Sequence, residues 1–347
     1  MKVKVKDIAK AAGVSSSTVS LVLNNRPSRI AEETKENIIR IARELRFQQE
    51  MGADFKEQKR ARVLGMVVPE GDNPFFQRLS GEVCRFAGQK GYVVFQCQPG
   101  NEIESFYQSL RALIEKSVDG LIVIPPETMD KENVKTLKSL QRSGPPMVLL
   151  DRAAYTVFCD FVTSDNKLGG RIATEYLLER GHRRIGCMVG GENVYTSRKR
   201  VNGYREALSA AGVAFDGGLV YYGSYSSQSG YEGAGYLLKQ GVTAIMAGSD
   251  QMARGVLEYA EKQGIEVPEK LSLIGYDNTP LCGYLSVPLT SVEQSGDMMA
   301  EKAVEILLQR IETWDEDEEE PCRNYYFTPS ITERESVAER EDTAEQK

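Results

Sequence analysis

The sequence predicts an α/β protein: a three-helix helix-turn-helix head at the N-terminus, followed by two doubly wound parallel-sheet lobes. Three observations predict it. The 347 residues are too many for one small domain and suit two or three. The first 45 residues have a helical apolar periodicity that a glycine interrupts. From Val63 onward, short apolar runs alternate with amphipathic stretches, as they do in repeated βα units.

The head begins with two short helices joined by a tight turn. Val5, Ile8 and Ala12 lie on one face of the first helix. Gly13 follows, and a glycine can turn the chain without the steric penalty of a Cβ atom. Ser15 stands where an N-cap is needed, with a hydroxyl that can accept a hydrogen bond from an amide of the second helix. That helix is expected to bury Val19, Val22 and Leu23.

A third helix completes the head. It is predicted over residues 30–45, after a polar loop, with Ile38, Ile41, Ala42 and Leu45 on one face. Two short helices around a glycine turn, with small polar residues leading the second, are typical of a helix-turn-helix whose second helix reads the major groove. We therefore expect the head to bind duplex DNA. A purely structural helical hairpin is the alternative.

The charge is divided unevenly along the chain. Residues 1–60 contain 13 Lys or Arg and 8 Asp or Glu, whereas the whole chain contains 43 and 50. A basic head on an acidic body is the pattern of a DNA-binding module attached to a part that stays off DNA. An ordinary solvated basic helix would give the same count, and the helix-turn-helix pattern decides between the two.

The remainder of the chain alternates strands with helices. Strands are predicted at 63–69, 92–96, 120–125, 146–151, 184–190, 219–222, 244–247 and 272–276. Helices are predicted at 75–88, 103–116, 131–142, 167–180, 198–211, 227–240 and 249–263. Two such series indicate two lobes. Ligands bind such sheets at the carboxyl ends of the strands, so the cleft between the lobes is the expected pocket.

Several classes of protein and site are disfavoured. No run of about 18 apolar residues suggests a membrane span, and no signal peptide is visible, so we expect a cytoplasmic protein. The six cysteines include no C-x-x-C pair, which argues against a disulfide framework or zinc site. No catalytic motif is present. We expect His182 to have a structural role. The acidic run 315–320 is expected to be a solvated loop. We expect no enzyme activity, cofactor or metal.

Motifs along nearly the whole chain resemble one known family. The head sequence D-I-A-K-A-A-G-V-S-S-S-T-V-S-x-V-L-N, followed by T-K-E-N-I-x-x-I-A-x-E-L, resembles the DNA-binding head of the lactose-repressor (LacI/GalR) family. Further matches follow in family order up to about residue 335: N-P-F-F at 73–76, L-D-R at 150–152, S-D-N-x-x-G-G at 164–170, G-H-R-R-I at 181–185, R-x-x-G-Y at 200–204, S-D-Q-M-A at 249–253 and L-I-G-Y-D-N at 273–278.

The resemblance implies a division into domains, in which the sensor core is similar to a periplasmic binding protein and the chain crosses between its lobes three times. The implied parts are a DNA-binding head at 1–47, a hinge at 48–62, an N-terminal lobe at 63–161 and 292–322, a C-terminal lobe at 162–291 and 323–335, and a polar tail at 336–347. The hinge departs from the family pattern at Gln49, Glu50 and Lys56, so minor-groove insertion by the hinge is not carried over to this chain.

The resemblance also implies residues that contact DNA. Ser16, Ser17 and Leu21 match positions that select bases, and Leu21 replaces an arginine that is common in the family. An operator with an altered half-site, with a thymine methyl group against Leu21, is expected. The DNA-binding candidates are Ser15, Ser16, Ser17, Thr18, Ser20, Leu21, Asn24, Asn25 and Thr34.

Seven residues after strands or in βα loops are candidates for holding a small ligand: Phe75, Asp151, Asp165, Arg200, Tyr225, Asp250 and Asp277. Carboxylates and Arg suit the hydroxyls of a sugar, and aromatic rings suit its C–H surface. By resemblance, Arg200 holds a polar ring substituent and Tyr225 stacks on the ligand. Other roles are open: Asp250 as a helix cap, Asp165 as an organiser of the crossover between lobes, and Phe75 as a core residue.

The sequence thus predicts a transcriptional regulator, expected to be a repressor, that binds operator DNA as a homodimer under the control of a small ligand, expected to be a saccharide. A nucleobase-sensing regulator of the same fold is an alternative. A solute-binding protein of a transport system would share the two lobes, but it would have a signal peptide and no basic helical head.

Overall fold

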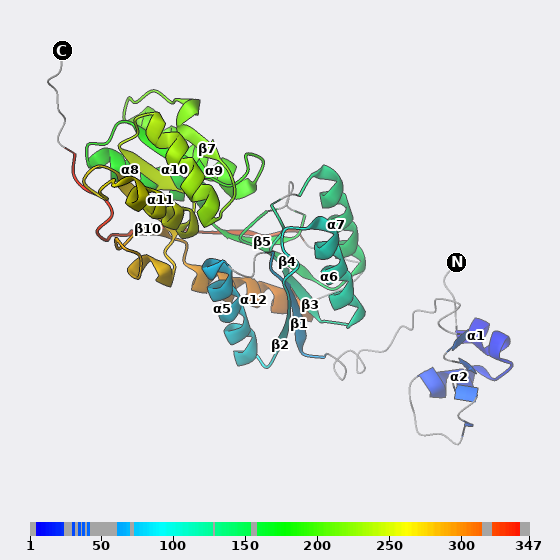
Figure 1. The fold of residues 1–347 in the computed structure, drawn as a ribbon. Coiled ribbons are helices and arrows are strands. Elements are labelled where there is room, and N and C mark those ends of the chain that lie inside the picture. The colour runs from blue at the N-terminus through cyan, green and yellow to red at the C-terminus, as the bar shows by residue number, and fades with distance from the viewer. Residues whose placement is uncertain are drawn as a thin grey trace, which may run out of the picture. The chain divides into compact units, whose positions relative to one another are not determined.

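The computed structural model describes residues 5–23, 30–31, 34–35, 37–38, 40–41, 61–69, 73–127, 129–153, 158–313 and 321–340 (Figure 1). The chain forms two compact units, Met1–Arg60 and Ala61–Lys347. The predicted hinge up to residue 60, Asn24, Asn25 and the acidic run 315–320 lie outside the described residues.

The first unit contains the two predicted helices, α1 (Val5–Ala12) and α2 (Ser16–Leu23). Gly13 between them has φ +66°, and the amide of Val14 donates to the carbonyl of Ala9 at 3.1 Å, which is the bond that closes a Schellman turn. The described residues between 34 and 41 are helical. The core of the head brings both segments together: Ile8, Ala9, Val19, Ile38 and Ile41.

The second unit begins with a lobe built on a six-stranded sheet. In spatial order its strands are β11 (Asn324–Phe327), β5 (Asp160–Ser164), β4 (Met147–Leu150), β3 (Gly120–Val123), β1 (Val63–Val67) and β2 (Val93–Cys97), all parallel. Helices α5 (Pro74–Gln89) and α12 (Gly296–Thr313) pack on one face, whereas α6 (Ile103–Glu115) and α7 (Lys131–Ser143) pack on the other (Figure 1).

The second lobe repeats this architecture. Its sheet has the order β12 (Ser330–Thr332), β10 (Thr290–Glu293), β9 (Ser272–Asp277), β8 (Ala244–Ala247), β6 (Ile185–Val189) and β7 (Val220–Tyr222), and only the β10–β12 pair is antiparallel. One face carries α8 (Asn166–Glu179) and α9 (Tyr195–Ala210), and the other carries α10 (Ser227–Lys239) and α11 (Asp250–Gln263). Short 3-10 helices lie at Gly217–Leu219 and Pro280–Gly283.

The chain crosses between the lobes after β5, after β10 and after β11. Each crossing lies later in the sequence than the predicted boundaries at 161, 291 and 322. In particular, residues 324–327 form a strand of the first lobe, not of the second. No strand was predicted from the sequence at the positions of β5, β10 and β11, so there were no strand ends from which to place the crossings. β5 begins with a charged residue, Asp160. The guanidinium of Arg310 neutralises that buried carboxylate through bonds of 2.6 and 2.8 Å.

The C-terminal segment also differs from its prediction as a polar tail. Residues 336–340 dock on the second lobe: Ser336 is fully buried and accepts a hydrogen bond from the amide of Thr290 at 2.9 Å. His182, which was expected to be structural, is buried beside this segment, with its ring nitrogens 2.9 Å from Thr243 Oγ1 and 3.3 Å from the carbonyl of Ala338. None of the helices in the described parts of the chain has the length and apolar character needed to cross a bilayer.

Candidate functional site

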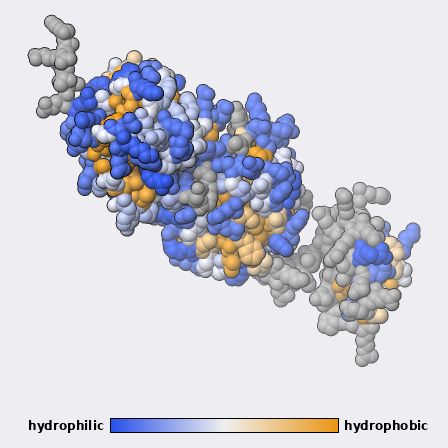
Figure 2. Space-filling model, in the orientation of Figure 1, coloured by the Kyte–Doolittle hydropathy of each residue, from blue (hydrophilic) through white to orange (hydrophobic). Residues whose placement is uncertain are grey.

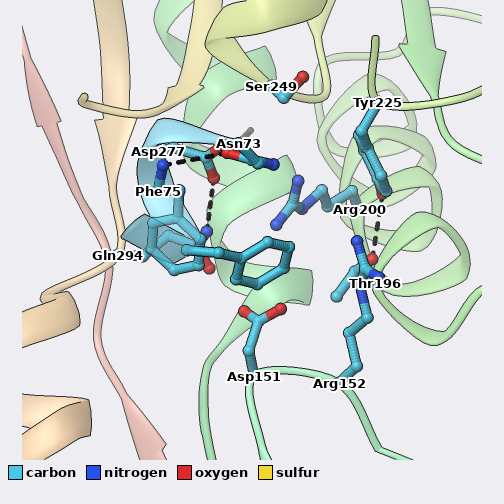
Figure 3. A pocket seen from close by; sticks show the side chains of 11 residues that line it. Asn73, Phe75, Asp151, Arg152, Thr196, Arg200, Tyr225, Ser249, Asp277 and Gln294 are labelled. Carbon is cyan, nitrogen blue, oxygen red and sulfur yellow. Dashed lines mark hydrogen bonds between the residues drawn. The ribbon is translucent and has the colours of Figure 1, made fainter. Parts of the chain in front are cut away.

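A polar pocket lies between the two lobes (Figure 3). It is lined by Asn73, Phe75, Phe76, Asp151, Arg152, Thr196, Arg200, Tyr225, Ser249, Asp277 and Gln294. The first five belong to the first lobe, and the others come from the second lobe or from the crossover that follows β10. They lie at or after the carboxyl ends of β1, β4, β6, β7, β8, β9 and β10, which is where open α/β sheets bind ligands.

Arg200 lies at the centre of this pocket. Its side chain is 4% exposed, Nε donates to Asn166 Oδ1 at 2.8 Å, and Nη1 donates to the carbonyl of Gly248. The guanidinium carbon lies 3.6 Å from the centroid of the Tyr276 ring, a cation–π contact in a buried setting. Figure 3 shows Asp277 and Gln294 to one side of Arg200 and Tyr225 and Thr196 to the other. The guanidinium is therefore fixed on the protein side, and it faces the pocket that it lines.

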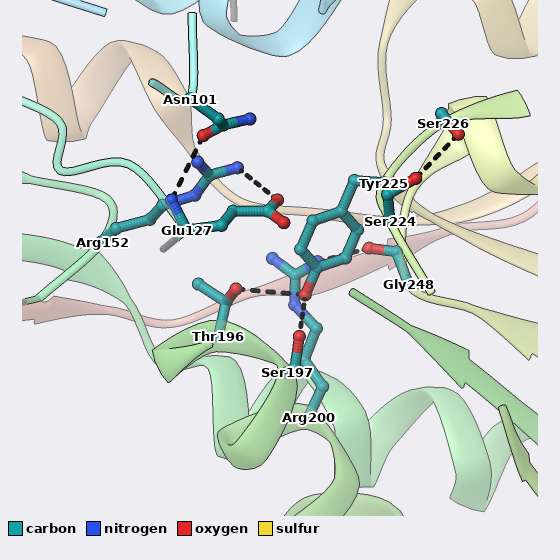
Figure 4. Close-up of polar contacts among 10 residues, drawn as sticks. All are labelled: Asn101, Glu127, Arg152, Thr196, Ser197, Arg200, Ser224, Tyr225, Ser226 and Gly248. Atoms are coloured by element: carbon teal, nitrogen blue, oxygen red, sulfur yellow. Dashed lines mark hydrogen bonds and ion pairs between the residues drawn. The ribbon is translucent and has the colours of Figure 1, made fainter. Parts of the chain in front are cut away.

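Tyr225 presents its ring and not its hydroxyl to the pocket. The hydroxyl is within hydrogen-bond distance of Thr196 Oγ1, at 3.1 Å, and of Ser197 Oγ, at 2.9 Å (Figure 4). The residue is 8% exposed and the guanidinium of Arg200 lies 5.4 Å from its ring centroid. Because the hydroxyl is already bonded on the protein side, the ring is held as a flat apolar wall.

Two carboxylates, Asp151 and Asp277, add negative charge to the pocket. Both have left-handed backbones, with φ of +63° and +107°, which is uncommon for residues other than glycine and is concentrated at functional positions. Burial raises the pKa of Asp277 well above its usual value, and Asp250 and Asp151 raise it further, whereas the charge of Arg200 opposes the shift.

Gln294 contributes an acceptor that the protein does not use. It is 1% exposed, and its Nε2 donates to Asp277 Oδ1 at 2.6 Å. Within the described part of the chain, its buried Oε1 has no hydrogen-bond partner. A buried acceptor without a donor lowers the stability of the fold unless a ligand or water donates to it. Gln294 Oε1 is therefore evidence that the pocket binds a polar ligand.

Two of the seven predicted ligand residues do not line the pocket. Asp165 caps α8 by accepting from the amides of Lys167 and Leu168 at 3.1 and 3.0 Å. Asp250 lies at the start of α11 but is 1% exposed. Its Oδ2 accepts from the amide and hydroxyl of Thr279, at 2.7 and 2.9 Å, and its Oδ1 accepts from the hydroxyl of Ser291 at 2.7 Å. Both carboxylates already have donors within the protein, so the prediction of ligand contacts for them is not supported by the geometry.

The other five predicted residues, Phe75, Asp151, Arg200, Tyr225 and Asp277, line the pocket together. Sequence reasoning missed the six remaining lining residues: Asn73, Phe76, Arg152, Thr196, Ser249 and Gln294. A position after a predicted strand was the available signal for the first five, whereas Gln294 follows β10, where no strand was predicted. Asn73 and Ser249 also cap α5 and α11, with bonds of 3.0 and 3.2 Å to the amides of Phe75 and Met252.

A larger cavity of about 340 Å³ adjoins the pocket at Asn73 and Tyr225. It is lined by polar side chains from both lobes, among them Glu127, Ser226 and Arg254. Arg152 Nη2 donates to Glu127 Oε1 at 3.2 Å, and this ion pair is largely buried (Figure 4). Among the described residues, no group of His, Cys, Asp or Glu side chains is placed to hold a metal ion.

In the head, the candidate DNA-binding residues lie on α2 and around it. Ser15 is the predicted N-cap, because its Oγ accepts from the amide of Thr18 at 3.1 Å. Ser16 and Ser17 are exposed, whereas Thr18, Ser20 and Leu21 are half-buried, as is Thr34 in the third helical segment. Exposed small side chains at the start of α2, over a buried Val19, leave that end of the helix open to a DNA groove.

Comparison with protein families gives two matches. Residues 4–50 match the model for bacterial regulatory proteins of the lacI family, and residues 174–337 match the model for a periplasmic binding protein-like domain.

Individual proteins match over greater lengths. The HTH-type transcriptional repressor PurR of Aliivibrio salmonicida is 32% identical over 336 residues, which are 96% of this chain and 98% of that protein. The structure of a transcriptional regulator CelR–cellobiose complex is 28% identical with a TM-score of 0.72, covering 96% of this chain and 100% of the other. A LacI family transcriptional regulator from Enterococcus faecium with bound ribose is 28% identical with a TM-score of 0.70, covering 80% and 100%.

Proposed function

Because this chain belongs to the lacI family of bacterial regulatory proteins, we propose that it is a cytoplasmic transcriptional repressor whose affinity for operator DNA is set by a ligand in the pocket between its lobes. The observation that carries the proposal is the central arginine, Arg200. It is buried against Tyr276, bonded to the second lobe, and placed in a pocket to which the first lobe contributes Asp151. A ligand that contacts both lobes favours one arrangement of them over another, which is the physical requirement for allosteric control.

A saccharide is the ligand class that this pocket fits best. Asp151, Asp277 and Gln294 offer acceptors for hydroxyl groups, and the ring of Tyr225 offers a flat surface for C–H groups. Two neighbours of the same fold were solved with cellobiose and ribose. A nucleobase is the second candidate, favoured by the relatives named PurR and by the two phenylalanines, Phe75 and Phe76, in the lining.

The ligand class can be tested by calorimetry and thermal unfolding with panels of monosaccharides, disaccharides and nucleobases. A saccharide that binds the folded state only should raise the Tm, and above its Kd the rise should grow with the logarithm of its concentration. Binding by nucleobases alone would replace the first candidate with the second. Binding by neither would remove the proposed ligand control.

We infer that the repressor is a homodimer, because a two-fold protein reads a two-fold operator. Apolar side chains at the free edges of both sheets support this: Val93 and Phe95 on β2 are 60% and 47% exposed, and Tyr222 on β7 is 39% exposed. Figure 2 shows apolar surface on the first lobe around the position of β1 and β2. Sedimentation at micromolar concentration should give twice the chain mass.

The regulator itself is tested by selecting duplexes from a random pool at two salt concentrations. A dimeric reader should recover a palindrome of about 16–20 bp, with affinity that falls steeply as salt rises, because phosphate contacts release counterions. If no sequence is enriched with or without the ligand, the proposal of a sequence-specific repressor fails.

Leu21→Arg is expected to change the base preferred at one position of each half-site. An arginine can donate to the O6 and N7 of guanine, whereas leucine offers only an apolar contact, such as with a thymine methyl group. Discrimination at that position should change by about 1–3 kcal/mol. Leu21→Met, which keeps the apolar character, is the control and should select the wild-type site. If Leu21→Arg also selects it, Leu21 does not read a base.

A further inference from the structure

Two cysteines that are far apart in the sequence meet at the edge of the first sheet. β5 and β11 are parallel with Asn324 opposite Phe161, and the amide of Phe161 donates to the carbonyl of Arg323 at 2.9 Å. The strands begin at Asp160 and Asn324, and extrapolating their register two residues toward the N-terminal ends puts Cys322 next to Cys159. The electrostatics agree: burial raises the pKa of the Cys159 thiol, and an ionised Cys322 is the next largest cause.

The two side chains lie on the same face of the sheet. Cys159 and Phe161 belong to the core that packs against α6 and α7. The ring of Tyr326 on β11 contacts Phe161 edge-on, with centroids 6.3 Å apart, whereas the ring of Tyr325 packs on the opposite side of the sheet. Because side chains alternate along extended chain, Cys322 shares the face of Tyr326 and therefore that of Cys159.

The backbone around Cys322 is held in place on both sides. The amide of Arg323 donates to Asp160 Oδ1 at 2.7 Å, and the carbonyl of Pro321 accepts from Arg310 at 2.7 Å. The same Arg310 forms the buried ion pair with Asp160. Neighbouring strands lie about 4.8 Å apart, within the range of about 4.4–6.8 Å between Cα atoms that a disulfide requires.

We propose that Cys159 and Cys322 form an oxidisable thiol pair, which hydrogen peroxide converts to a disulfide. Both are thiols in the structure, with Cys322 exposed and Cys159 only 5% exposed. The Cys322 thiolate attacks one oxygen of the peroxide, giving a sulfenic acid and the first water. The Cys159 sulfur then attacks the Cys322 sulfur, the S–S bond forms, and the second water leaves with the Cys159 proton. The two thiols lose two electrons and the peroxide gains them.

Because of the position of the pair, a disulfide between the two cysteines would affect the stability of both lobes. β5 and β11 each lead directly into a crossing to the second lobe. A bond between the bases of these strands closes a covalent loop over residues 160–321, which includes most of the second lobe. Cross-linking a loop of this length lowers the entropy of the unfolded chain, so the oxidised protein should have a Tm several degrees above that of the reduced one.

The test uses the full-length protein, treated with hydrogen peroxide, quenched, denatured and alkylated. Titratable thiols should fall from six to four, and mass spectrometry of the tryptic digest should find one linked peptide pair joining Cys159 to Cys322. The rise in Tm should reverse with dithiothreitol. Cys322→Ser, at an exposed position, should keep its remaining five thiols and show no shift in Tm.

The matched control is Cys84→Ser, which removes the other exposed cysteine, whose pKa burial also raises. This variant should still form the linked pair at the wild-type rate. A different linked pair, oxidation of Cys322 to sulfinic acid with Cys159 untouched, or equal thiol loss in Cys322→Ser would each overturn the proposal.

Discussion

Replacing Gly170 by alanine is expected to destabilise the second lobe by roughly 1–3 kcal/mol and to weaken ligand binding in the same step. Gly170 lies inside α8, where a Cβ atom would come within 2.2 Å of the carbonyl oxygen of Arg200 on α9 and within 2.8 Å of its Cα. Backbone cannot yield to this overlap as a flexible side chain would. Helix α9 must move away, and it carries the guanidinium at the centre of the pocket.

The measurement is urea unfolding together with ligand titration at a temperature where the variant is folded. Gly203→Ala tests the same contact from α9, because its Cβ atom would lie 2.0 Å from the carbonyl of Lys167. Gly81→Ala is the control: it lies inside α5 with no atom within 4 Å of the new Cβ, so it should gain up to about 1 kcal/mol from helix propensity. If Gly170→Ala is as stable as the wild type, the helices are not locked at this contact.

The alternation of βα units was predictable because most strands of these lobes are continuous apolar runs that no other element resembles. The strands at the crossings between the lobes were not predictable. β5, β10 and β12 contain Ser, Thr, Asp or Glu at many positions, since they run to the polar crossings or lie near a sheet edge. These polar side chains can bond to residues far away in the sequence. Ser291, for example, donates to Asp250 and accepts from the amide of Asn278. No local pattern predicts such contacts.

The residues of the pocket were predictable where they lie near the end of a predicted strand. Sequence position placed both Asp250 and Asp277 near the pocket, since Asp250 begins the helix after β8 and Asp277 ends β9. What separates them is the hydrogen-bond donors that tertiary structure brings. Thr279 and Ser291 surround Asp250, whereas among the described residues the carboxylate of Asp277 receives its bond from Gln294. The same residue type at equivalent positions is therefore structural in one case and open to a ligand in the other.

Asp277→Asn is consequently expected to raise the Tm by roughly 2–4 °C while it lowers ligand affinity about 10–100-fold. Burial is the largest cause that penalises the charge of Asp277. The attraction of Arg200 opposes it, and Asp250 and Asp151 add repulsion. Asparagine removes that charge, keeps an oxygen that can accept the bond from Gln294, and tolerates the positive φ of this position. The ligand, however, loses a charged acceptor.

The identical substitution at the neighbouring carboxylate should act in the opposite direction. Asp250→Asn would place an amide NH2 or a neutral oxygen against the donors of Thr279 and Ser291, and should cost about 2–4 kcal/mol of stability. Thermal unfolding of both variants in the absence of ligand, with ligand titration of each, separates the two roles. A loss of stability in both would mean that Asp277 is also structural.

The pH dependence supplies an independent check on Asp277. Its folded pKa is raised above the value of about 3.9 for an unfolded aspartate, so the folded state binds the proton more tightly. The stability contributed by this tighter proton binding at Asp277 is fully present below the pKa of the unfolded state. It is lost as the pH rises through the pKa of the folded state. Asparagine undergoes no such loss. The Tm advantage of Asp277→Asn should therefore be largest at neutral pH and shrink toward pH 4. An advantage that does not change with pH would come from the backbone conformation and not from the buried charge.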